Sequence, residues 1–495
     1  MNFLIKVFFT GAVICCSSFS GPISDHGARP ADISNKKLAG SKQPNILLIM
    51  TDQHNAEYLN CLGKTFLKTP NLDALAKQSV IFRSAYSPSP GCGPSRAAIF
   101  TGQYALDNGV YTNWIQVKSN SILFTEQLRR NGYFNILIGK LYLAPADSSH
   151  GFDYRRICDS PHGIYNKKEV EDNDYLPWAA AGMGISVEKL LEKTGKSELS
   201  NVEDTSFWIG KPWIDNKFHL TTWTGNEAVS AISGYENEKP FFMHVSFFGP
   251  HHPYSTCEPW NSMYDPKKVP LPPTLGQVQP GAQKGFHANW TESQWREIIA
   301  RYSGSISAID FQVGRIIAAL KEKGLWENTI IVFTADHGDH MGDYSQIGKG
   351  TMLESSVRVP FFIKPPGKKQ TGRECPDVIN LIDLYSTFLD YAGAKDAEVS
   401  DSRSLRGLLT GAPAWQDQTF STMCSADGRN GQVMYVNKNF KCVGFLTDGI
   451  MKVELYDRNE PVADQHNLAD NTAYADIRNN MKDKLEEWMK KNLKK

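Results

Sequence analysis

Short runs of consecutive apolar residues recur along the first two thirds of the chain, separated by segments with helical spacing. Four runs have the length and continuity of strands buried on both faces, at 45–50, 134–138, 241–248 and 329–334. Helical character lies between them, at about 71–78, 124–131 and 226–235. Because strands that alternate with helices form sheets covered on both faces, the pattern predicts an α/β fold with a mostly parallel central sheet flanked by helices.

The longest helical pattern covers residues 291–323, where apolar side chains recur every three or four positions. Thr291 and Gln294 have the spacing of a capping box, and Gly324 follows at the point where the pattern ends. We expect one long amphipathic helix that faces the core.

The pattern changes after residue 372. A helical segment at about 379–392 precedes three short alternating runs and a closing amphipathic helix; the runs lie at 432–435, 441–446 and 451–456, and the helix at about 477–493. Alternation with a period of two is typical of antiparallel strands. We therefore expect a main domain at 43–372 and a smaller C-terminal α+β subdomain at 373–495 that contains a short antiparallel sheet.

A polar residue follows each of the four predicted buried strands within about three positions. These residues are Asp52, Lys140, His251 and Asp336. Ligands of open parallel sheets bind beyond the carboxyl ends of the strands. We expect these four side chains to meet in one site.

Two of these residues belong to polar pairs, Asp52 with Gln53 and Asp336 with His337. Carboxylate and amide oxygens suit a hard divalent cation such as Ca²⁺ or Mg²⁺. A histidine ligand is unusual for calcium, so spacing alone leaves the ion open. The alternative for either aspartate is a turn or a helix cap.

The stretch at 87–102, SPSPGCGPSRAAIFTG, carries the most distinctive local chemistry. Pro94 suits the first turn of a helix, which would place Cys92 near the positive end of the helix dipole, where anionic groups are favoured. One alternative is a small residue packed under a turn. Another is a cysteine hydrolase in which the Cys92 thiolate is the nucleophile.

The N-terminal residues form a pattern of their own. Lys6 precedes ten almost uninterrupted apolar residues, and small polar residues follow, which is the layout of a secretory signal too short to span a bilayer. We predict a signal peptide at 1–20, a flexible leader at 21–42, and an exported protein, periplasmic or secreted, with no membrane span. Lipoprotein anchoring at Cys15 or Cys16 fits poorly, because the residues before them do not match that rule.

Composition changes this picture little. The 53 basic and 53 acidic residues leave no net charge to attract nucleic acid or a membrane surface, so we expect neither as a partner. Besides Cys15, Cys16 and Cys92, six cysteines remain, and an exported protein could pair some of them. Cys424 and Cys442 flank a predicted hairpin and are the first candidate pair.

Cys92 opens the pattern C-x-P-S-R-x-x-x-x-T-G, which is completed by Pro94, Ser95, Arg96, Thr101 and Gly102. The pattern resembles the signature of the type I, formylglycine-dependent sulfatases of the alkaline phosphatase superfamily. Further segments resemble the same family in the right order: PNILLIMTDQ, IGKLYLAPADSSHGFDY, SFFGPHHPY, TADHGDHMGD, GKGTMLESSVRVPFFI and VELYDRNEPVADQHNLAD. The resemblance spans about 44–366, continues more loosely to the end, and points to the exported glycan sulfatases of bacteria.

The resemblance implies that a formylglycine-generating maturation enzyme oxidises Cys92. Formylglycine would hydrate to a diol; one metal-activated oxygen would attack the sulfur of a sulfate ester, and the second hydroxyl would then expel sulfate. One divalent cation, Ca²⁺ by expectation and Mg²⁺ as the alternative, would be bound by Asp52, Gln53, residue 92, Asp336 and His337. Catalytic roles would fall to Cys92, Arg96, Lys140, His251 and Lys349. Substrate contacts would come from Lys140, Tyr142, His251, His252 and Lys349.

The expected reaction is the removal of sulfate from a sulfated carbohydrate, a glycan or a glycosaminoglycan fragment. Two positions depart from the family pattern. Gln53 replaces the usual second acid, and Tyr142 stands where histidine is usual, although a phenol is a poor proton carrier near neutrality. Because related phosphonate monoester and phosphodiester hydrolases also open with Asp-Gln, a phosphoryl substrate is the closest alternative. A carbohydrate-binding relative in which Cys92 is never oxidised is the alternative from another class.

Overall fold

The computed structural model describes residues 43–159, 173–194, 208–209, 214–254, 256–279, 285–367, 372–394, 401–411, 415 and 417–493. The predicted signal peptide and leader, with Cys15 and Cys16, lie outside the described residues. Among the residues described, no helix combines the length and the apolar character needed to cross a membrane.

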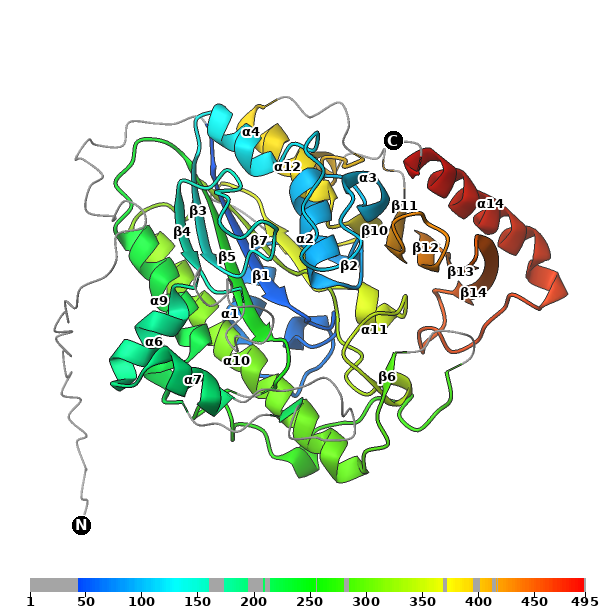
Figure 1. Cartoon of the computed structure of the whole chain (residues 1–495), viewed down its shortest axis with the longest axis horizontal. Helices are drawn as coiled ribbons and strands as arrows, with labels where there is room; N and C mark the ends of the chain where they lie inside the picture. The colour runs from blue at the N-terminus through cyan, green and yellow to red at the C-terminus, as the bar shows by residue number, and fades with distance from the viewer. Residues whose placement is uncertain are drawn as a thin grey trace, which may run out of the picture.

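An eight-stranded sheet forms the centre of the molecule, with the strand order β10-β2-β9-β7-β1-β5-β3-β4 (Figure 1). β9 is antiparallel to both of its neighbours, and every other neighbouring pair is parallel. The strands are β1 (Asn45–Asp52), β2 (Val80–Tyr86), β3 (Phe134–Gly139), β4 (Tyr154–Ile157), β5 (Phe241–Pro250), β7 (Thr329–Ala335), β9 (Phe361–Lys364) and β10 (Arg373–Asn380). The predicted α/β fold with a mostly parallel sheet is confirmed.

The four predicted buried strands are β1, β3, β5 and β7, and they lie together as β7-β1-β5-β3. Successive side chains of β1 enter opposite cores, because side chains alternate across a strand. Leu47 and Ile49 belong to the core on one face, and Ile46 and Leu48 to the core on the other. Both faces of this strand are therefore buried, which explains its unbroken apolar run.

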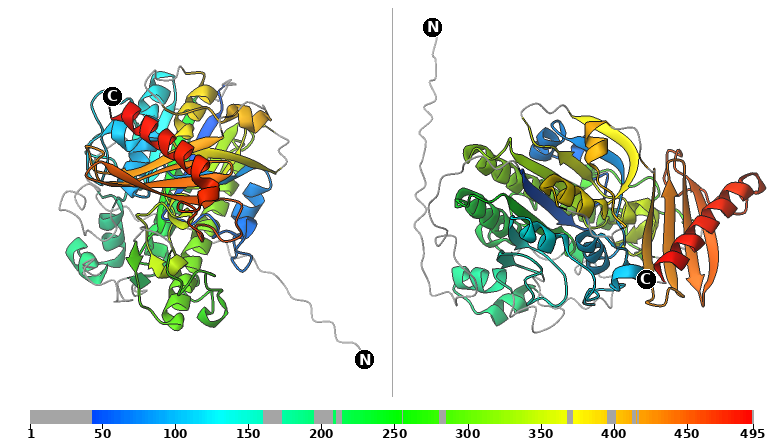
Figure 2. Two further views of the ribbon diagram at one scale, coloured as in Figure 1. Left: turned by 90° about the vertical axis from the view of Figure 1, so that its right-hand side faces the viewer. Right: turned by 90° about the horizontal axis from the view of Figure 1, so that it is seen from above.

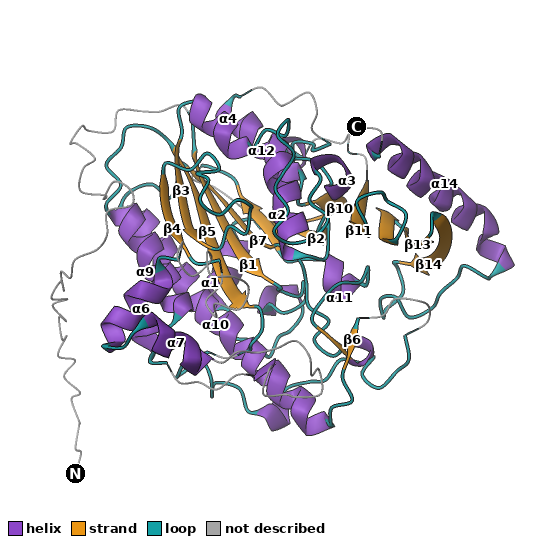
Figure 3. Cartoon of the chain, viewed as in Figure 1, coloured by secondary structure: helices purple, strands orange, loops and turns teal. Residues whose placement is uncertain are grey.

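Helices cover both faces of the sheet, as Figure 3 shows. One face is covered by α1 (Pro70–Ala76), α9 (Leu220–Ser233) and α10 (Glu292–Glu322), and the other by α2 (Cys92–Thr101), α4 (Phe124–Arg130) and α12 (Asp383–Ala392). The predicted capping box begins α10: Gln294 N donates to Thr291 Oγ1, and Thr291 N donates to Gln294 Oε1. Further described α-helices are α3 (Ala105–Asn108), α6 (Tyr175–Met183), α7 (Val187–Thr194), α11 (Glu354–Val357) and α13 (Arg406–Thr410).

The C-terminal part contains an antiparallel sheet of four strands in the order β11-β12-β13-β14. Its strands are β11 (Gln418–Cys424), β12 (Gly431–Asn437), β13 (Phe440–Thr447) and β14 (Ile450–Asp457). Helix α14 (Ala475–Asn492) lies across one face of this sheet (Figure 2), where Leu485 and Trp488 pack with Val433 and Leu455. A two-stranded ladder of β6 (Phe286–His287) and β8 (Gln346–Ile347) completes the described strands.

Several strands were not expected from the apolar pattern. β2 contains Arg83 and Ser84, which interrupt its apolar run, and β10 replaces the first residues of the helix expected at about 379–392. The division at residue 372 stays a prediction. The strand that follows it, β10, pairs with β2 at the edge of the large sheet, whereas the four-stranded sheet starts at β11.

Cys424 and Cys442, the first candidate pair, do not form a disulfide. Cys424 of β11 lies opposite Gly431 of β12, and Cys442 of β13 lies opposite Tyr435 of the same strand. The two cysteines lie on opposite sides of β12, at least about 9.5 Å apart at the usual strand spacing, and their positions are also offset along β12, which is too far for a disulfide. All seven described cysteines are free thiols.

Candidate active site

The four polar residues predicted to meet do lie at one edge of the large sheet. Asp52 ends β1, Lys140 follows β3, His251 follows β5 and Asp336 follows β7. The turn at Gly139 has φ 93°, and a Cβ there would collide with the carbonyl oxygen of Ser246. Only glycine permits this close approach of β3 to β5, and so the turn that brings Lys140 to the site.

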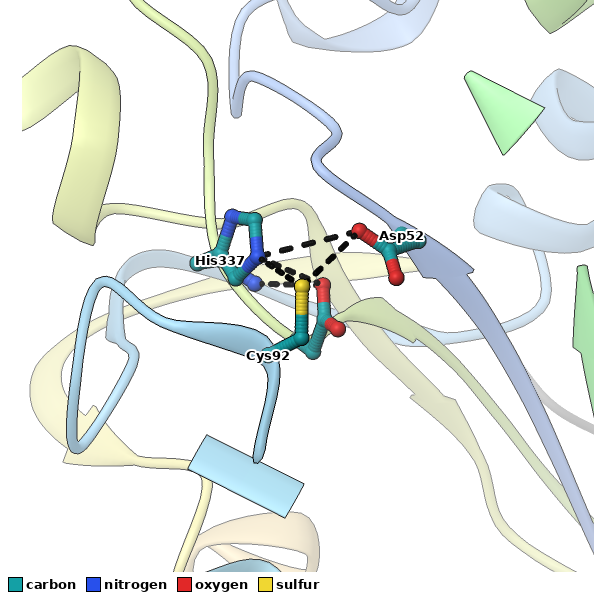
Figure 4. A group of neighbouring side chains, drawn as sticks. Asp52, Cys92 and His337 are labelled. Atoms are coloured by element: carbon teal, nitrogen blue, oxygen red, sulfur yellow. Dashed lines mark hydrogen bonds and ion pairs between the residues drawn. The ribbon is translucent and has the colours of Figure 1, made fainter. Parts of the chain in front are cut away.

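Cys92 is the first residue of α2, as the Pro94 argument predicted. Its Sγ lies 2.9 Å from Lys349 Nζ, 3.2 Å from His337 Nε2 and 3.6 Å from Asp52 Oδ1. Figure 4 shows Asp52, Cys92 and His337 pointing toward one another. Burial and Asp52 act to raise the pKa of the Cys92 thiol, but the cations of Lys140 and Lys349 outweigh them and lower it.

Asp52 is fully buried and lies among cations. Its Oδ2 is 2.5 Å from Lys140 Nζ and 3.5 Å from Arg96 Nη2, and its Oδ1 is 4.0 Å from Lys349 Nζ. Burial acts to raise the pKa of this carboxyl, but the cations of Lys140, Lys349 and Arg96 hold it well below its usual value. The residue is a carboxylate under all ordinary conditions.

Arg96 is also fully buried and connects three segments of the site. Its Nε donates to Asp336 Oδ2 over 2.9 Å, and its Nη1 donates to the Lys140 carbonyl and to Ser246 Oγ. The guanidinium therefore fixes α2, which carries Cys92, against the ends of β3, β5 and β7.

His337 directs its Nε2 toward the cluster. Its Nδ1 lies 3.0 Å from the Gly338 carbonyl, which can only accept, so Nδ1 carries a proton, and in the neutral ring Nε2 keeps its lone pair. Burial acts to lower the pKa of His337, but Asp336 and Cys92 raise it above its usual value. The anionic surroundings thus favour a cation at Nε2: a proton when the site is empty, which a metal ion would replace when bound.

Gln53 is oriented by a residue that the sequence reasoning did not single out. Its Nε2 donates to Asp339 Oδ2 over 2.6 Å, and Tyr254 OH donates to the same oxygen over 2.5 Å. Because a carboxylate only accepts hydrogen bonds, Asp339 forces the amide nitrogen of Gln53 toward itself and the amide oxygen away. That oxygen, Oε1, is buried and has no hydrogen-bond partner among the described residues.

The residues present fit a divalent cation. Asp52, Cys92, Asp336 and His337 each offer one ligand atom, and these atoms all lie within 4.8 Å of one another. Two carboxylates and an imidazole lone pair form a suitable donor set, and the unpartnered oxygen of Gln53 is the type of atom that a hard cation takes up. The predicted metal residues are therefore assembled in one place, although the identity of the ion stays a prediction.

The predicted sulfate-binding lysines occupy different positions in the site. Lys140 is 2% exposed and contacts Asp52, whereas the Lys349 side chain is 19% exposed and contacts Cys92. Tyr142 lies with its ring against Lys140 Nζ, 4.0 Å from the ring centre. Lys349 is thus the lysine that borders both the nucleophile position and solvent.

His251 and His252 are partly exposed and form the rim of the site, its border with solvent. His251 Nδ1 donates to the His252 carbonyl over 2.7 Å, which leaves Nε2 as an acceptor. Burial, followed by Lys349, lowers the pKa of His251 well below its usual value, so the imidazole is neutral. His252 lies 3.4 Å from Gln53 Nε2 and packs against the ring of Trp208.

The sequence reasoning missed the residues that hold the predicted ones. Asp339 orients Gln53, Asp159 accepts the backbone N–H groups of Leu141 and Tyr142, and Ser246 accepts from Arg96. Asp339 stands inside the recognised segment TADHGDHMGD, which was the available signal. Nothing near Asp159 in the sequence indicates that its side chain accepts the backbone N–H of Leu141, 18 residues earlier.

Two family models match the chain. The one described as Sulfatase covers residues 44–394, and the one described as N-sulphoglucosamine sulphohydrolase, C-terminal, covers residues 342–491. The arylsulfatase of Clostridium perfringens is 30% identical over 454 residues, which span 87% of this chain and 91% of that protein. The N-acetylglucosamine-6-O-sulfatase of Bacteroides thetaiotaomicron is 24% identical over 507 residues, 93% of this chain and 88% of that protein.

Solved structures of other proteins have a similar fold. The phosphonate monoester hydrolase of Agrobacterium radiobacter superposes with a TM-score of 0.75 and 26% identity, over 91% of this chain and 96% of that one. A protein solved in complex with its substrate D-glucosamine-2-N,6-O-disulfate gives a TM-score of 0.73 over 91% and 98%. At 20% identity, the second likeness shows the fold alone.

Proposed function

This chain belongs to the sulfatase family, and on that premise we propose that it removes sulfate from a sulfated carbohydrate, with formylglycine made from Cys92 as its reactive group and calcium as its metal. The family match by itself shows that the protein is a sulfatase, a hydrolase of the alkaline phosphatase-like superfamily. The substrate, the modification and the ion are the proposed parts.

The observation that carries the proposal is the balance of charge around Cys92. Arg96, Lys140 and Lys349 contribute three positive charges, and Asp52 and Asp336 contribute two negative ones. These five side chains together carry one net positive charge before any metal binds. A sulfate monoester carries a single negative charge, and the excess cation would stabilise the additional charge that develops on its oxygens in the transition state.

Each residue has a task that its contacts support. Arg96 holds Asp336 and α2 in register, and Lys140 neutralises Asp52 and would contact the transferred sulfate group. Lys349 lies beside the position of the nucleophile and is partly exposed to solvent. When bound, the metal and the aldehyde together supply an oxygen nucleophile at neutral pH. His251 is neutral in this structure, and an anionic substrate beside it would raise its pKa and help it protonate the leaving alkoxide.

A carbohydrate substrate is supported by the rim and by a relative. Trp114, His251 and His252 are partly exposed rings near the site, and rings of this kind pack against the apolar faces of sugars. The Bacteroides relative is named for a sulfated amino sugar. We expect a panel of sulfated mono- and disaccharides to contain a substrate that releases inorganic sulfate. Failure of the whole panel, together with turnover of a simple aryl sulfate, would contradict the carbohydrate assignment.

A phosphonate monoester or phosphodiester is the second candidate. The Agrobacterium likeness supports it, and such esters carry the same single negative charge as a sulfate ester. The experiment compares kcat/KM for an aryl sulfate, an aryl phosphonate monoester and an aryl phosphodiester with the same leaving group. A preference for either phosphoryl ester over the sulfate would replace the first proposal with the second.

The modification of Cys92 has a direct test. In protein isolated from its native host, peptide mass spectrometry should find residue 92 lighter than cysteine, because a carbonyl oxygen replaces the sulfur and two hydrogens. Cys92→Ala should abolish turnover and leave the thermal unfolding temperature close to that of the wild type. Unmodified cysteine in active protein, with inactivation by thiol alkylation, would support a cysteine nucleophile instead.

Export belongs to the proposal as well, because a sulfated glycan substrate and the N-terminal pattern both support a location outside the cytoplasm. Fractionation of the native host should find the mature protein in the periplasm or the medium, with an N-terminus near residue 21. A full-length protein in the cytoplasm would remove this part of the proposal.

A further inference from the structure

We propose that Tyr142 positions the catalytic lysine Lys140 through the face of its ring, as a cation–π partner whose hydroxyl group is not required. The inference rests on the proposed function in one respect, namely that Lys140 contacts the transferred sulfuryl group. It deepens that function by assigning a role to a residue that departs from the family pattern.

Tyr142 is held in an unfavourable backbone conformation. Its φ is 61°, in the left-handed region that tyrosine rarely adopts. The buried carboxylate of Asp159 accepts the N–H groups of Leu141 over 2.6 Å and of Tyr142 over 3.0 Å, with the same oxygen. Hydrogen bonds to a carboxylate are strong, so Asp159 offsets the strain and fixes the direction in which the Tyr142 side chain leaves the backbone.

That direction brings the ring to the Lys140 ammonium. Nζ lies 4.0 Å from the centre of the Tyr142 ring and 5.0 Å from the centre of the Phe248 ring, within the range of cation–π attraction. The third neighbour is Asp52 Oδ2, at 2.5 Å. Only 2% of Lys140 is exposed, so one carboxylate and two aromatic faces surround the ammonium in place of water.

A second ring supports the first. Trp114 packs edge-on against Tyr142, with 4.3 Å between ring centres and 61° between planes. The preceding residue, Asn113, accepts the backbone N–H of Gly93, the neighbour of Cys92, over 3.0 Å. The segment that supports Tyr142 is therefore tied to the nucleophile helix, so ring, lysine and nucleophile are fixed relative to one another.

The inference makes a ring, rather than a proton donor, the functional part of residue 142. A desolvated cation–π contact of this kind corresponds to a roughly 10- to 30-fold effect on kcat/KM when the aromatic face is lost. Loss of the hydroxyl group alone should cost no more than about threefold, because the ring face that contacts Nζ remains.

The first experiment compares Tyr142→Phe with Tyr142→Leu in the mature enzyme, using whichever aryl ester it turns over. We expect Tyr142→Leu to lose roughly 10- to 30-fold in kcat/KM and Tyr142→Phe no more than about threefold. Equal losses in the two variants would show that the hydroxyl group matters, and would overturn the inference. A Tyr142→Leu enzyme with the activity of the wild type would overturn it as well.

A second series separates electrostatics from shape. Phenylalanine with one, two and three ring fluorines at position 142 weakens cation binding stepwise and changes the ring's size little. We expect log(kcat/KM) to fall with each fluorine. The same series at Phe152, a buried ring that packs on Phe100 and Phe242, serves as the matched control and should show no such trend. A flat series at position 142 would reduce Tyr142 to a steric support.

A structural measurement keeps the inference independent of the substrate assignment. In a crystal structure of Tyr142→Leu, Lys140 Nζ should leave its position beside Asp52 Oδ2. A lysine that stays in place would contradict the inference even if the enzyme proved to act on phosphoryl esters. Conversely, if Lys140 is displaced in Tyr142→Leu but the wild-type enzyme has no sulfatase activity, the positioning role of Tyr142 stands and the proposed substrate is wrong.

Discussion

At the scale of single residues, the site is a balance of buried charges in which Lys349 is the least constrained member. Asp52 is paired with Lys140 and Arg96, and Asp336 is paired with Arg96. Lys349 has its shortest contact with the Cys92 sulfur and borders solvent. Its charge is therefore fully available to an incoming anion, whereas Lys140 and Arg96 are also paired with Asp52 and Asp336.

Lys349→Ala should lower kcat/KM by roughly 10²- to 10³-fold, because one cation that faces the transferred group is lost. Stability should change little, since Lys140 and Arg96 still neutralise Asp52. Steady-state kinetics and thermal unfolding check the two expectations. A variant with the kinetics of the wild type would show that the sulfate group is bound elsewhere.

Asp339→Asn should weaken calcium binding roughly 10- to 100-fold, as is typical when a group that orients a metal ligand is removed. An asparagine at this position can present an N–H₂ group to Gln53 and allow its amide to turn over, so that Oε1 no longer faces away from residue 339. Titration calorimetry with calcium measures the affinity directly, without turnover. Tyr254→Phe, which keeps the Asp339 carboxylate, is the matched control and should bind calcium more tightly than Asp339→Asn. Equal affinities in Asp339→Asn and the wild type would contradict the role of Asp339.

At the scale of elements, the parallel strands form the edge of the sheet where the polar residues lie, and the helices that pack on the faces of the sheet hold this edge in place. The N-terminus of α1 has no side-chain cap of its own, and Asp310 in the middle of α10 supplies one. Its oxygens accept the N–H groups of Leu72 over 2.7 Å and Asn71 over 3.3 Å. A buried acid thus joins two helices that cover the same face of the sheet.

The stability of this junction should depend on pH. Burial raises the pKa of Asp310 to about 6, against 3.8 for the unpaired group. The native protein therefore binds more protons than the unfolded chain between about pH 4 and 6, and stability falls as pH rises through that range. Relative to Asp310→Asn, the wild type should gain up to about 3 kcal/mol as the pH is lowered from 7 to 4. Urea unfolding of both proteins at several pH values measures the difference, and parallel pH dependences would contradict it.

At the scale of the whole molecule, the C-terminal sheet contacts the two segments that carry Cys92 and Lys349. Thr422 of β11 donates its N–H to the Pro88 carbonyl, four residues before Cys92. Lys441 of β13 is 1% exposed and reaches Glu354 at 3.3 Å, the Met352 carbonyl at 3.2 Å, and Asp464. The sheet therefore supports the active site as well as extending the molecule.

Lys441→Met should destabilise the protein by roughly 3–5 kcal/mol, because Glu354 and Asp464 lose a buried counter-charge. The loop that bears Lys349 should also loosen, so kcat should fall by a larger factor than KM changes. Lys452→Met, at an exposed position of β14, is the matched control and should match the wild type in both respects. Unfolding and steady-state kinetics test this, and unchanged kcat in folded Lys441→Met would limit Lys441 to a structural role.

The sequence by itself determined the four central strands β7, β1, β5 and β3, the capping box of α10 and the edge where the polar residues gather. Each of these follows from short-range patterns: strands buried on both faces must be apolar throughout, and a residue that directly follows such a strand must lie at its carboxyl end. The recognised segments also brought Cys92, Arg96, Lys349 and His337 into one predicted site, whose residues the structure assembles within contact distance.

Only the tertiary structure decided how these residues are held. Cys424 and Cys442 are free because a strand lies between them. The orientation of Gln53 depends on Asp339. The position of Tyr142 depends on its contacts with Asp159 and Lys140. Such contacts join residues far apart in the chain, and no local pattern of apolar and polar positions encodes them. The physical reason is that a buried charge or amide is stabilised by whichever partner packing brings to it, and that partner is set by the whole fold.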